Sequence, residues 1–228
     1  MLSRRDALRA LAGLGLAACD ASKPKRGILG VGERANERVQ SALLGDHEVS
    51  AGDITPADAF PVYHVAPGIP MPPAGWRLLV TGDVERPLSL DLDELHKMAR
   101  TDARIEHHCV EGWSAIATWT GVRLSEIAKR AGARETEYVN FRSFDVPQGG
   151  TVGYASCWDR ESAMHPQTMV AYGMNGAPLG PAHGAPVRIY AAVKLGYKQV
   201  KYLTEIQFIS KRLGGYWEDQ GYEWFAGV

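Results

Sequence analysis

The segment "RIEHHCVEGWS", residues 104–114, gathers several side-chain types that do chemistry. Its Cys109 follows two histidines, precedes Glu111, and is one of three cysteines in the chain. A thiol in this setting has four uses: a core side chain, half of a disulfide, a nucleophile or a metal ligand. The rest of the sequence decides among these uses.

Three familiar uses of Cys109 find only partial support. Cys157 is a candidate disulfide partner if the chain is exported, because thiols pair outside the cytoplasm. His107 and Cys109 fall on one face of a strand and could share zinc, but no C-x-x-C or H-x-x-x-H pair supplies the other ligands. Blue copper needs a histidine soon after the cysteine, and the next one is His165.

Cys157 also raises a hydrolase hypothesis. The segment "ASCWD" around it is similar to the nucleophile segment of papain-like enzymes. Those enzymes place the base histidine more than about a hundred residues after the nucleophile, and the chain ends sooner than that. We therefore interpret Cys157 as a buried thiol.

A thiolate can also bind a heavier metal that arrives within an organic cofactor. The protein then contributes one soft sulfur. It must also hold the phosphate and polar rings of the cofactor with Arg, Lys, His and backbone N–H groups. The second half of the chain carries such residues in glycine-flanked runs, namely His183, Arg188, Lys198 and Lys201.

The elements that would position these residues are mainly strands. Branched or alternating apolar runs predict strands over 76–84, 104–110, 137–143, 186–193 and 198–210. A strand end running into a short helix is predicted over 88–99, and a helix that ends at Gly132 over 121–133. The dipeptide Asn175-Gly176 predicts a hairpin. The fold class expected from this order is α+β, with mixed or antiparallel sheets and few short helices.

The N-terminal segment has the features of an export signal. Arg4-Arg5 precede a short apolar stretch, as in twin-arginine signals, and "LAAC" is similar to a bacterial lipobox ending at Cys19. We expect residues 1–19 to be the signal, with Cys19 lipidated, 20–54 a tether or docking segment, and 55–228 the functional domain. Asp20 favours retention at the inner membrane, so the expected location is the periplasm. That pathway moves folded proteins, often with a cofactor inserted.

The composition excludes some partners. The formal net charge is −1 and charges of both signs are mixed along the chain, which argues against nucleic acid binding. An apolar content of 45% with 25 glycines indicates a globular, loop-rich domain. Contact with a membrane is therefore expected only through the lipid anchor.

Three motifs, taken together, resemble the molybdopterin-binding domain of the sulfite oxidase family. They are "CVEGW", "MNGAPLGPAHGAPVRIY" and "GYKQVKYLTEI", in this order and spacing, and the resemblance spans roughly residues 55–208. Within the family the chain is most similar to small, haem-free bacterial members, which include periplasmic methionine-sulfoxide reductases. The ending "GYWEDQGYEWF" is also typical of bacterial members.

The resemblance implies a role for each matching residue. Cys109 would be the thiolate ligand of molybdenum, with one molybdenum-molybdopterin per chain and no haem. The remaining cofactor contacts implied are Tyr63, His64, Ser143, His183, Arg188, Gln199, Val200 and Lys201, with Asp145 as a neighbouring candidate. Cys109 is also the implied catalytic residue. His107 or Glu111 could relay protons, whereas Trp113 is expected to pack the loop.

The sequence departs from the sulfite-oxidising members at two places. Those members bind the substrate anion with arginines, and the corresponding places here hold Val62 and, near Ser114, no basic residue. No C-x-x-C-H haem motif is present, so we expect a separate electron-transfer protein, either a membrane cytochrome or a soluble cytochrome c. The chain after Phe208 is shorter than the dimerisation domain of the larger members, which favours a monomer.

The function that this pattern predicts is oxygen-atom transfer by a molybdenum oxidoreductase. The first expectation is reduction of S-oxides or N-oxides, including methionine sulfoxide in proteins. The alternatives are oxidation of sulfite or another small sulfur compound, a cofactor-free binding module, and a zinc hydrolase using His107 and Cys109.

Overall fold

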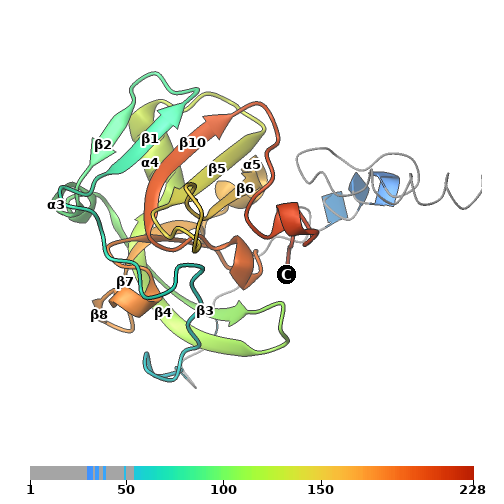
Figure 1. Ribbon diagram of the computed structural model, residues 1–228. Coiled ribbons are helices and arrows are strands. Elements are labelled where there is room, and N and C mark those ends of the chain that lie inside the picture. The colour runs from blue at the N-terminus through green and yellow to red at the C-terminus, as the bar shows by residue number, and fades with distance from the viewer. Residues whose placement is uncertain (1–29, 33, 36–37, 40–48, 50–53) are drawn as a thin grey trace, which may run out of the picture.

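The computed structural model describes residues 30–32, 34–35, 38–39, 49 and 54–228. Two five-stranded sheets form the framework of this part of the chain (Figure 1). The predicted signal with Cys19 lies outside the described residues, as does most of 20–54. Within the described ranges, no helix has the length and apolar character needed to cross a membrane.

The first sheet is mixed and has the order β2-β1-β10-β5-β6. Only the β1–β10 pair is parallel, and the other neighbours are antiparallel. The strands β1, β10 and β5 lie side by side in Figure 1. Their bounds are β1 (Leu78–Gly82), β2 (Leu88–Leu90), β5 (Tyr138–Ser143), β6 (Ala155–Asp159) and β10 (Leu203–Ile209).

The second sheet is antiparallel and carries Cys109 at one end. Its order is β3-β4-β7-β8, with β9 also pairing with β7. The long β3–β4 hairpin projects at one edge of Figure 1, and its turn holds "CVEGW". The bounds are β3 (Arg100–His108), β4 (Ser114–Arg123), β7 (Met169–Met174), β8 (Ala177–Pro178) and β9 (Arg188–Tyr190).

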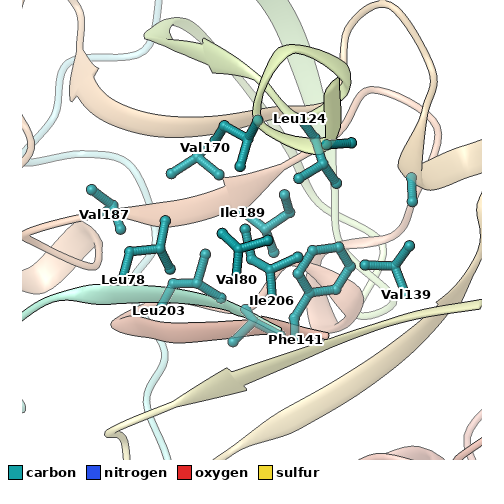
Figure 2. Close-up of a cluster of buried hydrophobic side chains, with 14 of the residues drawn as sticks. Leu78, Val80, Leu124, Val139, Phe141, Val170, Val187, Ile189, Leu203 and Ile206 are labelled. Atoms are coloured by element: carbon teal, nitrogen blue, oxygen red, sulfur yellow. The ribbon is translucent and has the colours of Figure 1, made fainter. Parts of the chain in front are cut away.

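The main core lies between the two sheets. Figure 2 shows Val80, Phe141 and Ile206 of the first sheet beside Val170 and Ile189 of the second. All five side chains are fully buried. Burial of this kind contributes about 1.5–3 kcal/mol for each large aliphatic or aromatic side chain. The loops that carry functional residues therefore start from a fixed frame.

The helices are short and have clear local causes. Helix α4 (Leu124–Ala131) buries Leu124, Ile127, Ala128 and Ala131, which share one face at helical spacing. It ends at Gly132 in the left-handed conformation, as predicted. The other helices within residues 54–228 are α3 (Leu92–His96), α5 (Arg160–Ala163) and the 3-10 turns η1 (Pro181–His183), η2 (Gly196–Lys198) and η3 (Glu218–Gln220).

The α+β fold class and most predicted elements are confirmed, with three differences. The strand predicted over 198–210 is a 3-10 turn followed by the shorter β10. Strands β4 and β6 were not predicted. In β4 the buried positions include Ala115 and Ala117, and alanine carries little strand preference, which hides the two-residue alternation.

Candidate active site

A pocket of about 290 Å³ has Cys109 in its wall. The thiol is half-buried and lies in the tight turn that joins β3 to β4. The backbone N–H of Cys109 donates to Trp113 O at 3.0 Å, and Gly112 N–H donates to Cys109 O at 3.1 Å. The turn therefore holds the sulfur in a fixed direction at the edge of the second sheet.

Glu111 is the nearest polar partner of this thiol. The Cys109 thiol donates to Glu111 Oε2 at 3.8 Å, and Trp113 Nε1–H donates to the same oxygen at 3.0 Å. Burial, together with the negative charge of Glu111, raises the pKa of the Cys109 thiol. A bound metal cation removes a proton from a thiol in such a position, because the thiolate is the form that binds.

His107 lies beneath the turn and is buried. Its ring stacks on Trp113 with 5.6 Å between centroids, and its Nδ1 lies 3.4 Å from the Tyr190 hydroxyl. Burial, with the nearby positive charge of Arg188, lowers the pKa of His107 to about 3. A side chain added at Gly196 would meet His107 Nε2 at 2.6 Å, so glycine is required where this loop crosses the ring.

Two cationic side chains enter the pocket without a carboxylate partner. Arg188 donates to the carbonyl oxygens of His183 at 3.2 Å and Gln199 at 3.4 Å, while its Nε has no partner among the described residues. Lys201 donates to Ala182 O at 3.0 Å. Burial lowers the pKa of Arg188 to about 10 and that of Lys201 to about 7, the latter also through repulsion by Arg188.

His183 lies beside these cations. Its Nε2 hydrogen-bonds to Ala57 O at 2.8 Å, and burial lowers the pKa of the imidazole. The guanidinium carbon of Arg188 lies over the rings of Trp119 and Tyr190, at 4.9 and 5.6 Å from their centroids. The aromatic packing and the two carbonyl contacts hold the guanidinium in place without neutralising it, which suits an anionic ligand.

Asp145 fixes the first loop of the pocket. Its carboxylate accepts from Val65 N–H at 3.0 Å and Ala66 N–H at 2.8 Å. These bonds hold the adjoining Tyr63 and His64 at the pocket wall. Ser143 Oγ in turn accepts from Asp145 N–H at 2.9 Å.

Two predicted contact residues do not line the pocket. Ser143 is buried and acts on Asp145, and Val200 is fully buried with its carbonyl bound by Ile189 N–H. Gln199 does line the pocket, although its side-chain amide donates to the carbonyls of Ala191 and Lys194. The other predicted residues, Tyr63, His64, Cys109, His183, Arg188 and Lys201, meet in the pocket. The cofactor contacts assigned to all of these residues stay predictions.

The pocket also has aromatic walls that the sequence analysis did not single out. They come from Phe60, Tyr154, Tyr197, Trp217 and Tyr222. Tyr154 donates its hydroxyl to Tyr197 O, and burial raises its pKa well above the usual value. The dense aromatic ending "GYWEDQGYEWF" is the one sequence signal that could have indicated the last two.

Two buried ion pairs hold the segment that follows β9. Lys198 pairs with Glu218, both fully buried, and Ser156 Oγ donates to the same carboxylate at 2.6 Å. Lys194 pairs with Asp159 at 2.7 Å. Lys198 therefore lies outside the pocket and is structural, unlike the expectation that it belongs to the anion-binding set.

The alternative uses of the cysteines do not fit this geometry. Cys109 and Cys157 are both free, and Cys157 is fully buried in β6. In the described part of the chain no three His, Cys, Asp or Glu side chains converge to hold a metal ion. The donor set for a zinc hydrolase is therefore missing there.

Comparison with protein families gives a direct match to the oxidoreductase molybdopterin binding domain over residues 64–217. The chain belongs to this family. The matched range contains Cys109, Arg188 and Lys201 and ends within the aromatic C-terminal segment.

Curated relatives point to the same family. The chain is 39% identical over 166 residues to the protein-methionine-sulfoxide reductase catalytic subunit MsrP of Xanthomonas campestris, which covers 67% of the chain and 52% of that protein. It is 32% identical over 149 residues to the oxidoreductase YuiH of Bacillus subtilis, covering 64% and 72%. The chain thus spans about half the length of the sulfoxide-reductase relative.

A solved structure supports the fold. The sulfane dehydrogenase SoxCD of Paracoccus pantotrophus matches with a TM-score of 0.61 and 22% identity, covering 72% of this chain and 45% of that chain. At this identity the likeness concerns the architecture alone. It confirms the sulfite-oxidase-like fold that the motifs predict.

The residues of the pocket fit a molybdopterin cofactor. Cys109 offers one soft sulfur. Arg188, with its unpartnered buried Nε, and Lys201 offer positive charge for a phosphate. A buried guanidinium without an anion is costly, so a phosphate bound there would remove a penalty that the folded protein otherwise carries.

Proposed function

We propose that this protein is a molybdenum-cofactor-dependent oxidoreductase that reduces S-oxides, with methionine sulfoxide in proteins as the first substrate to test. The observation that carries the proposal is the joint presence in one pocket of Cys109 and two cations, Arg188 and Lys201, that form no salt bridge within the described part of the chain. The family supports the cofactor. The printed names of relatives such as MsrP support the substrate class.

The roles of the chain's own residues follow from their positions. Cys109 Sγ would hold the metal, and Arg188 and Lys201 the phosphate of the pterin. Tyr63 and His64, held through Asp145, would border its rings. The bound cofactor supplies the oxygen-atom transfer chemistry, and the protein binds and orients it. Reduction of one S-oxide consumes two electrons and two protons and yields a thioether and water.

Proton supply near the metal falls to Glu111 in this proposal. Its carboxylate is exposed and lies beside Cys109 Sγ. A carboxylate in that place can pass protons from solvent toward the reacting oxygen. His107 suits this role poorly, because its low pKa keeps the ring neutral and its ring is packed under Trp113.

Oxidation of sulfite is the weaker candidate. Val62 and Ser114, which stand where sulfite-oxidising members carry arginines, offer no positive charge, and Ser114 Oγ donates to Glu106 at 2.6 Å. A dianion would meet no cation there. N-oxides remain in the test panel, because the pocket does not separate them from S-oxides. Family membership argues against a cofactor-free binding module.

The cellular setting is part of the same proposal. Export through the twin-arginine signal, lipidation at Cys19 and attachment to the periplasmic face of the inner membrane fit an enzyme loaded with its cofactor before export. Electrons would come from a separate electron-transfer protein. Labelling with a fatty-acid analogue, compared with Cys19→Ser, tests the anchor.

The deciding experiment is metal analysis of the full chain, exported from a host that makes the pterin cofactor. We expect about one molybdenum per chain, lost or loosened in Cys109→Ala, and retained in the matched control Cys157→Ala. The loaded protein is then assayed with S-oxides and N-oxides, using a reduced viologen dye as electron donor. Folded wild-type protein without molybdenum would contradict the proposal, and zinc in its place would favour a hydrolase.

A further inference from the structure

Four aromatic rings form a connected cluster at the pocket. Trp217 contacts Tyr63 at 6.0 Å and Tyr222 at 5.0 Å between ring centroids, and Tyr222 contacts Tyr197 at 5.2 Å. All four residues line the pocket that contains Cys109. We call Tyr63, Tyr197, Trp217 and Tyr222 the aromatic rim.

Two members of the aromatic rim, Tyr63 and Tyr222, are exposed, and Tyr197 and Trp217 are half-buried. Tyr63 is 62% exposed and Tyr222 39%, and Val110, next to the thiol, is 48% exposed. Arg188 is only 5% exposed. Large apolar side chains gathered at the mouth of a pocket mark a binding surface more often than chance exposure does.

The charge distribution separates the two parts further. Arg188 and Lys201 are the only Lys or Arg side chains among the described residues that line the pocket. Both are directed to carbonyl groups of 182–199 rather than to the rim. The rim therefore offers ring faces and tyrosine hydroxyls, which suit the neutral, apolar parts of a ligand and give no cation to an anion.

The rim is also held in place before any ligand binds. The Tyr197 hydroxyl donates to Glu223 O at 2.5 Å, and Leu195 N–H donates to Ala226 O at 2.9 Å. The buried pair Lys198–Glu218 joins the same two segments. A surface fixed in this way loses little conformational entropy on binding.

We propose that Trp217 and Tyr222 form a substrate subsite beside the reacting centre, and that it takes the methylene stem of an oxidised methionine and the adjoining backbone of a flexible polypeptide. The inference rests on the proposed function and deepens it. Each methylene group buried against these rings gains about 0.8 kcal/mol, equal to about fourfold in affinity. The exposed Tyr63 and Val110 extend the apolar surface beyond one side chain, which suits the flanking polypeptide.

The experiment compares two substrates that react at the same centre. The molybdenum-loaded full chain is assayed with a reduced viologen donor on dimethyl sulfoxide and on a short peptide carrying methionine sulfoxide. Tyr222→Ala should lower kcat/KM for the peptide about fourfold or more, mainly through KM, and change it less for dimethyl sulfoxide, which lacks the methylene stem and the backbone. Tyr222→Phe should restore the peptide value, because the ring is retained.

Binding is measured separately from turnover. Without an electron donor the sulfoxide peptide binds but is not reduced, and calorimetry should show the same loss of affinity in Tyr222→Ala. Trp217→Phe gives a second variant that keeps a ring at the other position. Tyr172→Ala is the matched control, because this tyrosine packs on His96 and does not line the pocket.

Two results would overturn the inference. Equal loss on both substrates would assign the rim a structural role, and unchanged constants for the peptide would remove it from the substrate path. Failure of the proposed function looks different: loaded wild-type protein would then reduce no S-oxide at all.

Discussion

Residues 188–201 carry four cationic side chains that differ in what they face: Arg188, Lys194 and Lys198 are buried, and Lys201 is half-buried. Lys194 and Lys198 each contact a carboxylate, that of Asp159 or of Glu218. Arg188 and Lys201 donate to carbonyl groups and lie over aromatic rings, and neither forms a salt bridge with a described residue, although the Asp145 carboxylate attracts Lys201. The paired Lys194 and Lys198 stabilise the fold. Arg188 and Lys201 instead carry a charge that is unfavourable in the folded protein, and an anionic ligand would offset it.

The comparison shows how the proposed ligand site differs from a structural site of the same composition. Burial opposes the charged form of Arg188 and Lys201, and their pKa values fall to about 10 and about 7. Within 188–201, the sequence alone does not tell which lysine pairs with a carboxylate and which one faces the pocket. The carboxylate partner decides this, and for Lys198 the partner is Glu218 in the C-terminal segment.

The largest expected effect comes from breaking the fully buried pair. Lys198→Met leaves the Glu218 carboxylate without its cation, and we expect the free energy of unfolding to fall by about 3–5 kcal/mol. The measurement is denaturant unfolding of the cofactor-free protein. The double variant Lys198→Met/Glu218→Leu should recover much of the loss, and an equal or larger loss would show that packing rather than charge is responsible.

Arg188→Met should change the stability of the protein little and its cofactor loading strongly. The cofactor-free protein should change by less than about 1.5 kcal/mol, because the lost carbonyl contacts are offset by removal of an unpaired buried charge. Cofactor loading should fall at least about tenfold, since the phosphate loses a charge-assisted partner. Molybdenum content measures the cofactor loading, and unfolding curves measure the stability. Severe destabilisation without a change in loading would reverse the assignment.

The effect of Lys201 on the stability of the cofactor-free protein should depend on pH. Its folded pKa of about 7 lies below the ordinary value of 10.5, so its charge penalises the folded state fully below pH 7. The penalty fades as pH rises toward the unfolded pKa. The cofactor-free wild type should therefore gain stability relative to Lys201→Met between about pH 7 and 9. Parallel stability curves in this window would contradict the low pKa.

The same lysine predicts proton uptake on cofactor binding. A phosphate beside Lys201 favours the ammonium form and raises its pKa. At about pH 8 the wild type should take up a fraction of a proton as the cofactor binds, and Lys201→Met should take up less. Calorimetry in two buffers of different ionisation enthalpy measures this difference.

The sequence predicted the parts of the site whose signals are local. Cys109, His183, Arg188 and Lys201 stand in short motifs with fixed spacing, and the strands and the hairpin around them follow from alternation and from Asn175-Gly176. Each of these features depends on residues close together in the chain. The pocket then brings the four side chains together.

Features that depend on distant contacts were missed. Trp217 and Tyr222 reach the pocket only because Lys198–Glu218 and the Tyr197–Glu223 hydrogen bond fold the C-terminal segment against the loop after β9. Lys198 looked like an anion ligand for the same reason: its carboxylate partner lies 20 positions later in the sequence. No periodicity or motif encodes such a pairing.

The two structural ion pairs should also differ in how much they contribute to stability. The Asp159 side chain is 15% exposed, whereas Glu218 is fully buried. Burial alone would raise the pKa of Asp159, but the charge of Lys194 and hydrogen bonds from Lys194 and Ser162 outweigh it, and the pKa falls below 3.8. Asp159→Asn should cost about 1.5–3 kcal/mol at neutral pH, less than Lys198→Met.

The contribution of Asp159 should also depend on pH. A carboxyl group whose pKa is lower in the folded state stabilises the fold at pH values above its unfolded pKa, and this contribution disappears as the pH falls through the folded pKa. Wild type and variant should therefore converge in stability below pH 3.8, and a constant difference down to the acid transition would assign the stabilisation to packing.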